Sequence, residues 1–309
     1  MSEAPSLIGL GMSTLDVLVS SEALPRWEGC VPLDDLSLDG GGMAANTLVA
    51  FSKLGGRSGL VGVCGNDHLA DLKLGLLEKA GVDIRLVVRL AEDEPAMTLV
   101  FVQTSSGERT FASTGRMRKR PLAVEELDRA AITSADGLFL DGFHSQAALA
   151  AAGWMREAGK PVFLDAGRSE NADDLTVRSL IPLSTVLFGG AGFGAAYSGA
   201  NELLDAGKFI LSQGRAVYVE TLGEQGSWTF SSETIIQNDA FAVNAVDTTG
   251  AGDVFHGAFL LAWMQGRSLL DAGRFASAAA AIKCMRRGAQ AGCPTNHEVM
   301  SFLAERQGG

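Results

Sequence analysis

Segments of strand length and of helix length alternate through the second half of this chain of 309 residues. Short apolar runs typical of buried strands occur at 137–141, 162–165, 185–188 and 216–221. Helical patterns separate these runs at 146–158, 174–180 and 201–212. Parallel strands need crossover connections of this length, whereas antiparallel strands can be joined by short turns. The alternation therefore predicts an α/β fold with a mainly parallel sheet and helices on both of its faces.

The first half of the chain contains further strands and helices, together with a hairpin. The short runs at 6–11 and 16–20 both predict strands, and Asp16 lies at their junction. Apolar residues at 59–65 predict a strand, and Asn66 and Asp67 can cap a helix that runs to Ala80. Hairpins that interrupt a strand–helix series usually form a separate small sheet. We therefore predict an exposed small sheet from the hairpin at 98–103 and 109–113 and from the mixed segment 27–39, and a second hairpin at 227–230 and 235–237.

Composition and charge exclude several classes of protein. The net charge of −11 argues against nucleic-acid partners, because such binding draws most of its affinity from Lys and Arg. The cysteine spacings match no zinc or redox motif and indicate reduced thiols. The chain starts without the features of a signal peptide, and no run of about 18 apolar residues occurs that could cross a membrane. These features predict a cytoplasmic protein. Because no linker divides the chain, we predict a single domain over residues 1–309.

A glycine-rich turn, Val246-Asp-Thr-Thr-Gly-Ala-Gly-Asp253, leads into an apolar helix. Such a turn leaves backbone N–H groups directed at one point, where the helix dipole also favours phosphate. Asp253 would repel phosphate unless it has a role such as taking a proton from an attacking hydroxyl. A tight turn with Asp253 as helix N-cap is the alternative for the last four residues. The whole string is more specific and favours a phosphate site with a general base.

A second glycine cluster, Gly40-Gly-Gly-Met-Ala-Ala-Asn46, leads into another helix. Successive glycines let a ligand approach the backbone closely, and Asn46 offers a donor and an acceptor suited to hydroxyls. A plain flexible turn is the alternative interpretation. The two glycine clusters together predict one site with a polyol end and a phosphate end. Ligands of parallel sheets gather at the carboxyl ends of strands, where the sequence predicts Asp16, Asp141, Asp165 and Thr221.

The common nucleotide-binding motifs do not occur. The chain has no Gly-x4-Gly-Lys-Ser/Thr loop and no His-Arg-Asp set of the protein kinases. The start of Gly9-Leu-Gly11-Met-Ser-Thr14 is similar to a dinucleotide turn, but Thr14 stands where the third glycine is required. Phosphoryl transfer needs positioning, charge neutralisation and a base near the attacking oxygen, all of which the two glycine clusters and Asp253 offer.

Four motifs give the chain a resemblance to the PfkB/ribokinase family of sugar kinases. Asp247–Asp253 resembles their C-terminal signature, and Gly41–Asn46 resembles their N-terminal one. Thr221-Leu-Gly-Glu-Gln-Gly226 resembles the turn on their nucleotide side, and Gly288–Pro294 resembles their closing loop. The motifs occur in family order across almost the whole chain. The resemblance implies a ribokinase-like, doubly wound domain with a small β-sheet lid, which we expect at about 16–39 and 98–113.

The resemblance also implies the parts of an ATP-dependent phosphoryl transfer to a sugar hydroxyl. Asp253 would be the base, and the transferring group would be held by the amides of Gly250, Ala251, Gly252 and Asp253. Sugar hydroxyls would be bound by Asp16, Gly41, Gly42 and Asn46. The ATP side would be lined by Thr221, Gly223 and Gly226. A monovalent cation such as K⁺ would lie among Asp247, Thr249 and the carbonyls near Arg287 and Gly288.

The chain departs from the family after the strand at 185–188. Many members have Asn-x-x-Glu there, which organises Mg²⁺-bound phosphates through water, but here Gly190 and Phe193 occupy those positions. Mg²⁺ is still expected, because ATP reaches a kinase with its metal. The segments Val254–Ala258, Arg274–Ser277 and Lys283-Cys284 resemble a bacterial branch of the family that includes sulfofructose kinase.

The leading interpretation is a kinase for a ribose-like or ketohexose-like sugar, and two alternatives stay open. A nucleoside kinase of the same superfamily would need a base pocket, for which the candidates are Trp27, Phe101 and Phe111. A catalytically silent sugar- or nucleotide-binding relative would explain the lost Asn-x-x-Glu. The resemblance also implies a homodimer formed through the lid.

Other residues near the predicted site have competing interpretations. For His256 we favour packing or hydrogen bonding over acid–base chemistry. Asp165 and Arg168 are as well suited to pairing with each other as to contacting a nucleotide. One basic cluster could clamp an anionic substituent, although a solvated surface is the favoured interpretation: Arg109, Arg116, Arg118, Lys119 and Arg120.

Overall fold

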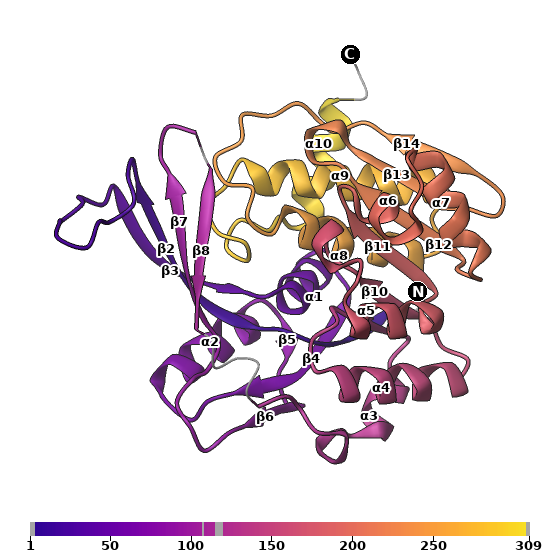
Figure 1. The fold of residues 1–309 in the computed structure, drawn as a ribbon, viewed down its shortest axis with the longest axis horizontal. Helices are drawn as coiled ribbons and strands as arrows, with labels where there is room; N and C mark the ends of the chain where they lie inside the picture. Colours follow the sequence, from indigo (N-terminus) through magenta and orange to yellow (C-terminus); the bar gives the residue numbers. More distant parts are fainter. Residues whose placement is uncertain (1–3, 107, 115–119, 307–309) are drawn as a thin grey trace.

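The computed structural model describes residues 4–106, 108–114 and 120–306, and it contains two sheets (Figure 1). Arg116, Arg118 and Lys119 of the predicted basic cluster lie outside the described residues. The larger sheet has ten strands, and β1 lies between β4 and β9 in its interior. Its strands are β1 (Ser6–Leu10), β4 (Arg57–Cys64), β5 (Val82–Asp83), β6 (Val87–Arg89), β9 (Gly137–Leu140), β10 (Val162–Asp165), β11 (Val186–Gly190), β12 (Val217–Thr221), β13 (Ser227–Ser231) and β14 (Ile235–Asn238).

Most neighbouring strands of the large sheet run parallel, as the alternation predicts. The order β12-β11-β10-β9-β1-β4-β5 is parallel throughout, and β6 also pairs with β4 in parallel. The predicted second hairpin is present as β13 and β14, which extend the same sheet in antiparallel fashion beyond β12. The sequence prediction missed β5 and β6 because strands of two and three residues are too short for periodicity.

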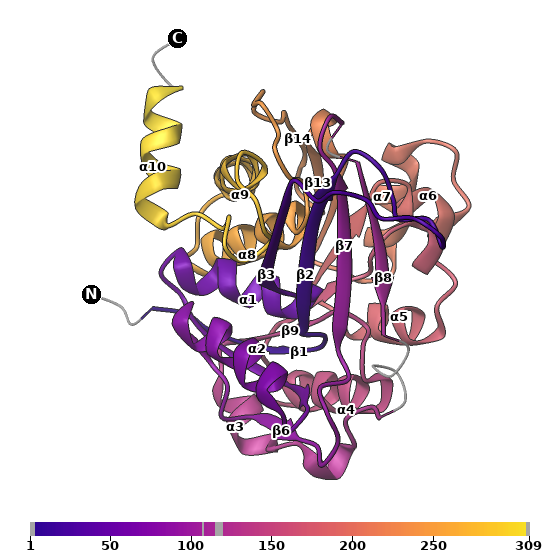
Figure 2. The ribbon, with the colours of Figure 1, turned by 90° about the vertical axis from the view of Figure 1, so that its left-hand side faces the viewer.

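Helices cover both faces of the large sheet (Figures 1 and 2). One face carries α1 (Met43–Lys53), α2 (His68–Lys79), α8 (Ala251–Met264), α9 (Leu269–Cys284) and α10 (Asn296–Glu305). The other carries α3 (Arg129–Ser134), α4 (Ser145–Glu157), α5 (Leu175–Leu180), α6 (Phe193–Ser198) and α7 (Leu203–Ser212). Short 3-10 turns occur at Val124–Glu126, Ser169–Asn171, Ile181–Leu183 and Gly223–Gln225.

The core is divided between these two faces by the period of the strands. Successive side chains of a strand point to opposite faces, so neighbours in sequence enter different layers. Phe163 and Phe188 pack under α8 and α9, whereas Leu164 and Leu187 pack with the helices of the opposite face.

The short helices α3 and α6 were not predicted. Helix α6 has six residues and starts between Gly192 and Gly194, so its local propensity is weak.

The small sheet projects from the rest of the molecule, at the left in Figure 1. Its order is β3 (Asp35–Gly41), β2 (Thr14–Ser21), β7 (Met97–Gln103) and β8 (Arg109–Ser113). Asp16 is the third residue of β2, so it does not lie at a junction between two strands as the sequence indicated. Of the mixed segment 27–39, which was predicted to join this sheet, only residues 35–39 belong to a strand, the first part of β3. Within the described ranges, no helix combines the length and apolar character required to cross a membrane.

Candidate active site

Helix α8 begins where the glycine-rich turn ends. Gly250 is its N-cap with a φ of 73°, in the left-handed region that favours glycine. A Cβ at this position would lie 2.7 Å from the Cβ of Ala289. The Ala251 N–H donates to the Thr248 carbonyl, whereas those of Gly252 and Asp253 belong to the first turn and have no acceptor within the helix. The glycine-rich turn is therefore present as predicted, and its free N–H groups have a geometry that can bind an anion.

Helix α1 begins in the same way, beside the small sheet. Its N-cap is Gly42, with a φ of 96°, and Gly41 ends β3 next to Asp16. A Cβ on Gly41 would lie 2.1 Å from Asp16 Oδ2, so the close approach requires glycine. Thr14 Oγ1 donates to Asp16 Oδ1 at 2.6 Å, and burial raises the pKa of Asp16 to about 6. The small sheet thus holds a carboxyl group against the start of α1.

The two helix starts are joined through Asn46. Its Nδ2 donates to Asp253 Oδ2 at 2.8 Å, and its Oδ1 accepts from Gln290 Nε2 at 3.1 Å. Thr47, the next residue of α1, donates from Oγ1 to the Asp253 carbonyl at 3.3 Å. The Gln290 contact fixes which end of the Asn46 amide faces Asp253. Asn46 therefore orients the carboxylate of Asp253, a contact that the sequence did not indicate.

Asp141, which follows the last residue of β9, holds the segments around the start of α1 in place. Its Oδ2 accepts from the N–H groups of Met12 at 2.8 Å and Ala44 at 3.2 Å, and its Oδ1 accepts from Phe143 N at 3.0 Å. Burial raises the pKa of Asp141 to about 6. These bonds tie the loop after β1 to the first turn of α1, so the polar strand end predicted at Asp141 has a supporting part in the site.

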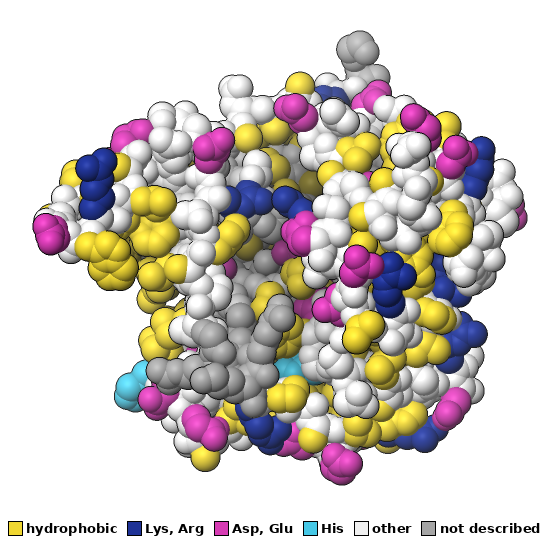
Figure 3. Space-filling view, in the orientation of Figure 1, with side chains coloured by type: hydrophobic (Ala, Val, Ile, Leu, Met, Phe, Trp, Pro, Cys, Tyr) yellow, Lys and Arg dark blue, Asp and Glu magenta, His cyan; other side chains and the backbone are white. Residues whose placement is uncertain are grey.

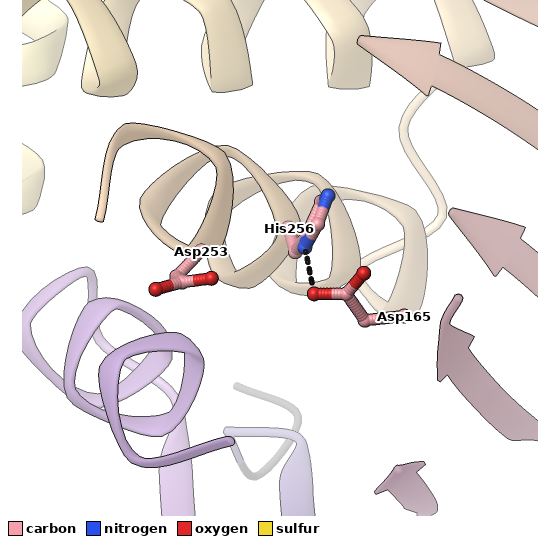
Figure 4. Close-up of side chains that lie close together, drawn as sticks. All are labelled: Asp165, Asp253 and His256. Carbon is pink, nitrogen blue, oxygen red and sulfur yellow. Dashed lines mark ion pairs between the residues drawn. The ribbon is translucent and has the colours of Figure 1, made fainter. Parts of the chain in front are cut away.

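A buried pair lies beside Asp253 (Figure 4). Asp165 ends β10 and faces His256 of α8, with 3.4 Å between Asp165 Oδ2 and His256 Nδ1, while the His256 ring packs on Phe188. Asp165 thus has a partner other than Arg168. Ligand atoms of Asp165, Asp253 and His256 lie within 4.8 Å of one another, close enough to share a metal ion. Burial and then the charge of Asp165 raise the pKa of Asp253 to about 7, which suits a general base.

A pocket of about 550 Å³ connects the two helix starts with the small sheet. In the space-filling view it belongs to the hollow between the small sheet and the rest of the molecule (Figure 3). Phe111 and Phe143 supply aromatic surface in this pocket. The predicted site residues that line it are Asp16, Gly42, Asn46, Thr249, Gly250 and Asp253.

Arg109 also lines the pocket, which corrects the preference for a solvated position. It is the first residue of β8, and its guanidinium donates to Thr248 Oγ1 in the glycine-rich turn. Burial lowers the pKa of Arg109. Arg120, from the same predicted cluster, instead pairs with Glu126 at 2.5 Å on the surface. Sequence could not separate these arginines, because only the register of β8 directs Arg109 toward the turn.

The residues predicted for the nucleotide side lie outside the lining of this pocket. Thr221 ends β12, and the turn to β13 contains Gly223 and Gly226 with φ values of 61° and 84°. A Cβ on Gly226 would lie 2.0 Å from the Asn238 carbonyl oxygen, so local geometry already requires that glycine. Thr221 is half-buried at the carboxyl end of a parallel strand, where ligands of such sheets bind.

Comparison with known proteins identifies the family. Residues 19–296 match the pfkB family of carbohydrate kinases. The chain belongs to this family. Over 97% of the chain and 98% of the relative, it is 29% identical to an ATP-dependent ribose-1-phosphate kinase of Halopiger xanaduensis. It is 27% identical to a nucleoside kinase of Methanothermobacter thermautotrophicus, over 99% of the chain and 98% of the relative.

A solved ribokinase of the same fold supports this assignment. The ribokinase of Arabidopsis thaliana, determined with ribose and ATP, superimposes with a TM-score of 0.82 and 25% identity. The superposition covers 97% of this chain and 99% of that one. The ribokinase-like fold with a large, mostly parallel sheet and a separate small sheet is thus confirmed, as is membership in a family of ATP-dependent sugar and nucleoside kinases.

One pfkB-family feature, the cation site predicted from the resemblance, is arranged around a lysine. Asp247 accepts at Oδ1 from Thr249 N and at Oδ2 from Gly288 N, each at 2.8 Å. The fully buried Lys283 ammonium donates to the Asp247 carbonyl at 2.6 Å and lies 3.5 Å from Asp247 Oδ2. Burial raises the pKa of Asp247, but the charge of Lys283 and the hydrogen bonds outweigh burial and lower it overall. Arg287 turns outward and pairs with Asp35 of β3.

The positions of the family's Asn-x-x-Glu carry no acidic or amide side chain. Gly190 ends β11, and Phe193 begins α6 with its ring fully buried against Tyr197. The nearby Glu220 of β12 is also buried, and its carboxylate accepts from the N–H groups of Gly192 and Gly194 and from the hydroxyl of Tyr218. Glu220 therefore holds the start of α6 and offers no free oxygen in place of the missing glutamate.

Proposed function

We propose that this protein is an ATP-dependent sugar kinase that phosphorylates a hydroxyl of a ribose-like or ketohexose-like substrate. One observation carries the proposal: Asp253, with a pKa near 7, lies in one pocket with both helix starts and is oriented by Asn46. A base poised near neutral pH next to an anion-binding turn suits phosphoryl transfer to a neutral hydroxyl.

Each part of the site has a role in this proposal. Asp253 removes the proton of the attacking hydroxyl, whose oxygen forms a bond to the γ-phosphorus while the bond to the β-phosphate oxygen breaks and ADP leaves. Of the predicted amides of Gly250, Ala251, Gly252 and Asp253, that of Ala251 donates to the Thr248 carbonyl, and the others stabilise the charge of the transferring group. Sugar hydroxyls bind at Asp16, Gly41, Gly42 and Asn46. Thr221, Gly223 and Gly226 line the ATP side, and Mg²⁺ enters with ATP as part of the substrate.

Nucleosides are a second candidate class of substrate. Phe111 and Phe143 line the pocket, and an aromatic surface can stack on a base. Of the other aromatic candidates, Trp27 lies outside every strand and is fully exposed. The relative from Methanothermobacter thermautotrophicus is a nucleoside kinase. Two polar residues of the small sheet, Asp16 and Thr98, favour a sugar because they face the same pocket.

The small sheet fits the role of a lid, built from residues 16–39 and 98–113 of a single domain over 1–309. Asp16 pairs across the sheet with Asp39 and Thr98, on the face toward the site. The adjacent residues on these strands, Val17, Leu38 and Leu99, also lie opposite one another, and both leucines are exposed. This apolar outer face supports a homodimer formed through the two lids. A cytoplasmic location accords with a kinase that uses ATP.

The proposal is tested by measuring acceptor-dependent ADP release with Mg-ATP and a panel of acceptors. Suitable acceptors are ribose, fructose, tagatose, deoxygluconate, sulfofructose, fructose phosphates and nucleosides. We expect turnover with one or more sugars. Turnover restricted to nucleosides would replace the sugar with the second candidate. Calorimetric binding of a sugar without any turnover would identify a catalytically silent relative.

A further inference from the structure

Lys283 is a buried cation that takes no part in the proposed chemistry. It lies near the end of α9, and its side chain has no exposed surface. Its ammonium group donates to the carbonyls of Asp247, at 2.6 Å, and Arg286, at 3.3 Å. The carboxylate of Asp247 is 3.5 Å away. A buried charge is tolerated in a protein only when such partners compensate it.

These partners belong to two segments that meet beside the active site. Asp247 lies in the glycine-rich turn that leads into α8, and Arg286 begins the loop that returns past Gly288 to Gln290. Gly288 N donates to Asp247 Oδ2, and Gln290 contacts Asn46, the residue that orients Asp253. Lys283 therefore ties the turn carrying the anion-binding amides to the loop that supports the general base.

The same two segments are those that the family resemblance assigns to a monovalent cation. The oxygens of Asp247 are already engaged here. The Asp247 carbonyl and carboxylate already face the ammonium group, and each carboxylate oxygen also accepts an N–H bond. A potassium ion sharing these oxygens would lie within a few ångströms of a buried positive charge, and the two cations would repel each other.

We propose that the ammonium group of Lys283 takes the place of the monovalent cation, so that this kinase needs no K⁺. An ammonium group carries one positive charge and binds the carbonyl and carboxylate oxygens that a desolvated alkali ion would bind. Because the cation is part of the chain, the turn before α8 keeps its shape in any salt. This inference concerns the ion requirement and is independent of which sugar is the substrate.

The wild-type protein provides the first test. Acceptor-dependent turnover and the melting temperature are measured in K⁺-free buffer, with ATP as its Tris salt, and compared with KCl and choline chloride at equal ionic strength. We expect the rate in K⁺ to stay within about twofold of that in choline, the range of general salt effects. Activation by K⁺ of about tenfold or more over choline, or a melting temperature raised by K⁺ alone, would overturn the proposal.

Lys283→Ala provides the second test, because it removes the ammonium group and leaves space and uncompensated oxygens for an ion. We expect this variant to melt at a higher temperature in KCl than in choline chloride, by about 2 °C or more, and to recover turnover in K⁺. Lys160→Ala is the matched control, since Lys160 donates to the carbonyls of Thr133, Ser134 and Ala135, remote from the site. It should melt at the same temperature in both salts.

The outcomes separate this inference from the proposed function. A folded Lys283→Ala variant that ignores K⁺ in both readouts would show that the lysine replaces no cation. If that variant does not fold in either salt, the wild-type comparison decides alone. The melting temperatures require no substrate, so a failure to find the sugar would leave them valid.

Discussion

The amide nitrogen of Asn46 lies 2.8 Å from Asp253 Oδ2 and joins the starts of two helices, although the two residues are 207 positions apart in the chain. Because Asn46 also accepts from Gln290, its orientation is fixed before any substrate binds. The carboxylate is therefore aimed into the pocket by a side chain of the sugar half of the site. This relationship makes the two glycine clusters one site.

Asn46→Ala tests that relationship. The donor from Asn46 lowers the pKa of Asp253, so its loss leaves the carboxylate poorly oriented and raises that pKa further. We expect kcat/KM for the acceptor to fall by about 10- to 100-fold, as for other misplaced catalytic groups. Steady-state kinetics give the value. Gln290→Ala, which removes only the partner of Asn46, should have a smaller effect, and an Asn46→Ala rate within twofold of wild type would exclude the orienting role.

The pH profile of kcat/KM reports the protonation of Asp253. Burial and then the charge of Asp165 raise its pKa to about 7. The ionised carboxylate is the base, so activity is full above this pKa and falls by about tenfold per pH unit below it. Asp165→Asn removes one raising charge and should move the acidic limb to lower pH. If the acidic limb stays at the same pH in Asp165→Asn, it does not report the protonation of Asp253.

Gly41→Ala tests the close approach at the sugar end. The added Cβ would lie 2.1 Å from Asp16 Oδ2 and 2.5 Å from Thr14 Oγ1, so Asp16 must move. We expect KM for the acceptor to rise by about tenfold or more while KM for ATP changes little. Gly75→Ala is the control, since nothing lies near its Cβ on α2. If KM for the acceptor and KM for ATP rise equally, Asp16 has no specific role in binding the sugar.

Arg109→Gln tests whether a lid residue stabilises charge in the transition state. Arg109 lies in the pocket and contacts Thr248, two residues before Gly250. We expect kcat to fall by about 10- to 100-fold, because the guanidinium neutralises the transferring phosphoryl group. Arg120→Gln, which breaks a surface pair with Glu126, should leave kcat unchanged. A fall in kcat of the same size for both variants would assign the effect to the loss of a positive charge in general and not to the position of Arg109.

Sequence predicted the elements whose signals are local. The strand at 162–165 matches β10 residue for residue, and α2 has the predicted cap at Asp67, because strand patterns and capping depend on neighbours in the chain. Likewise the glycine-rich turns at Gly42 and Gly250 are visible in sequence, since only glycine adopts their backbone conformation readily.

The remaining parts of the site depend on contacts between distant segments. The sequence pattern predicts that a lysine in an alanine-rich helix is exposed. Lys283 becomes buried only when the loop after α9 folds back on Asp247. The same holds for Arg109, whose direction is set by its register in β8, and for Gln290, whose partner lies in α1. Pairings of this kind carry no signal in the local pattern of one sequence.

Asp253→Asn tests the central claim most directly, through acceptor-dependent ADP release with Mg-ATP. The variant keeps an oxygen that can accept from Asn46 but cannot take the proton of the hydroxyl. We predict that kcat falls by roughly 100- to 10,000-fold, the usual contribution of a general base, while circular dichroism and sugar binding are retained. Turnover of Asp253→Asn close to that of wild type would contradict the assignment of Asp253 as the base.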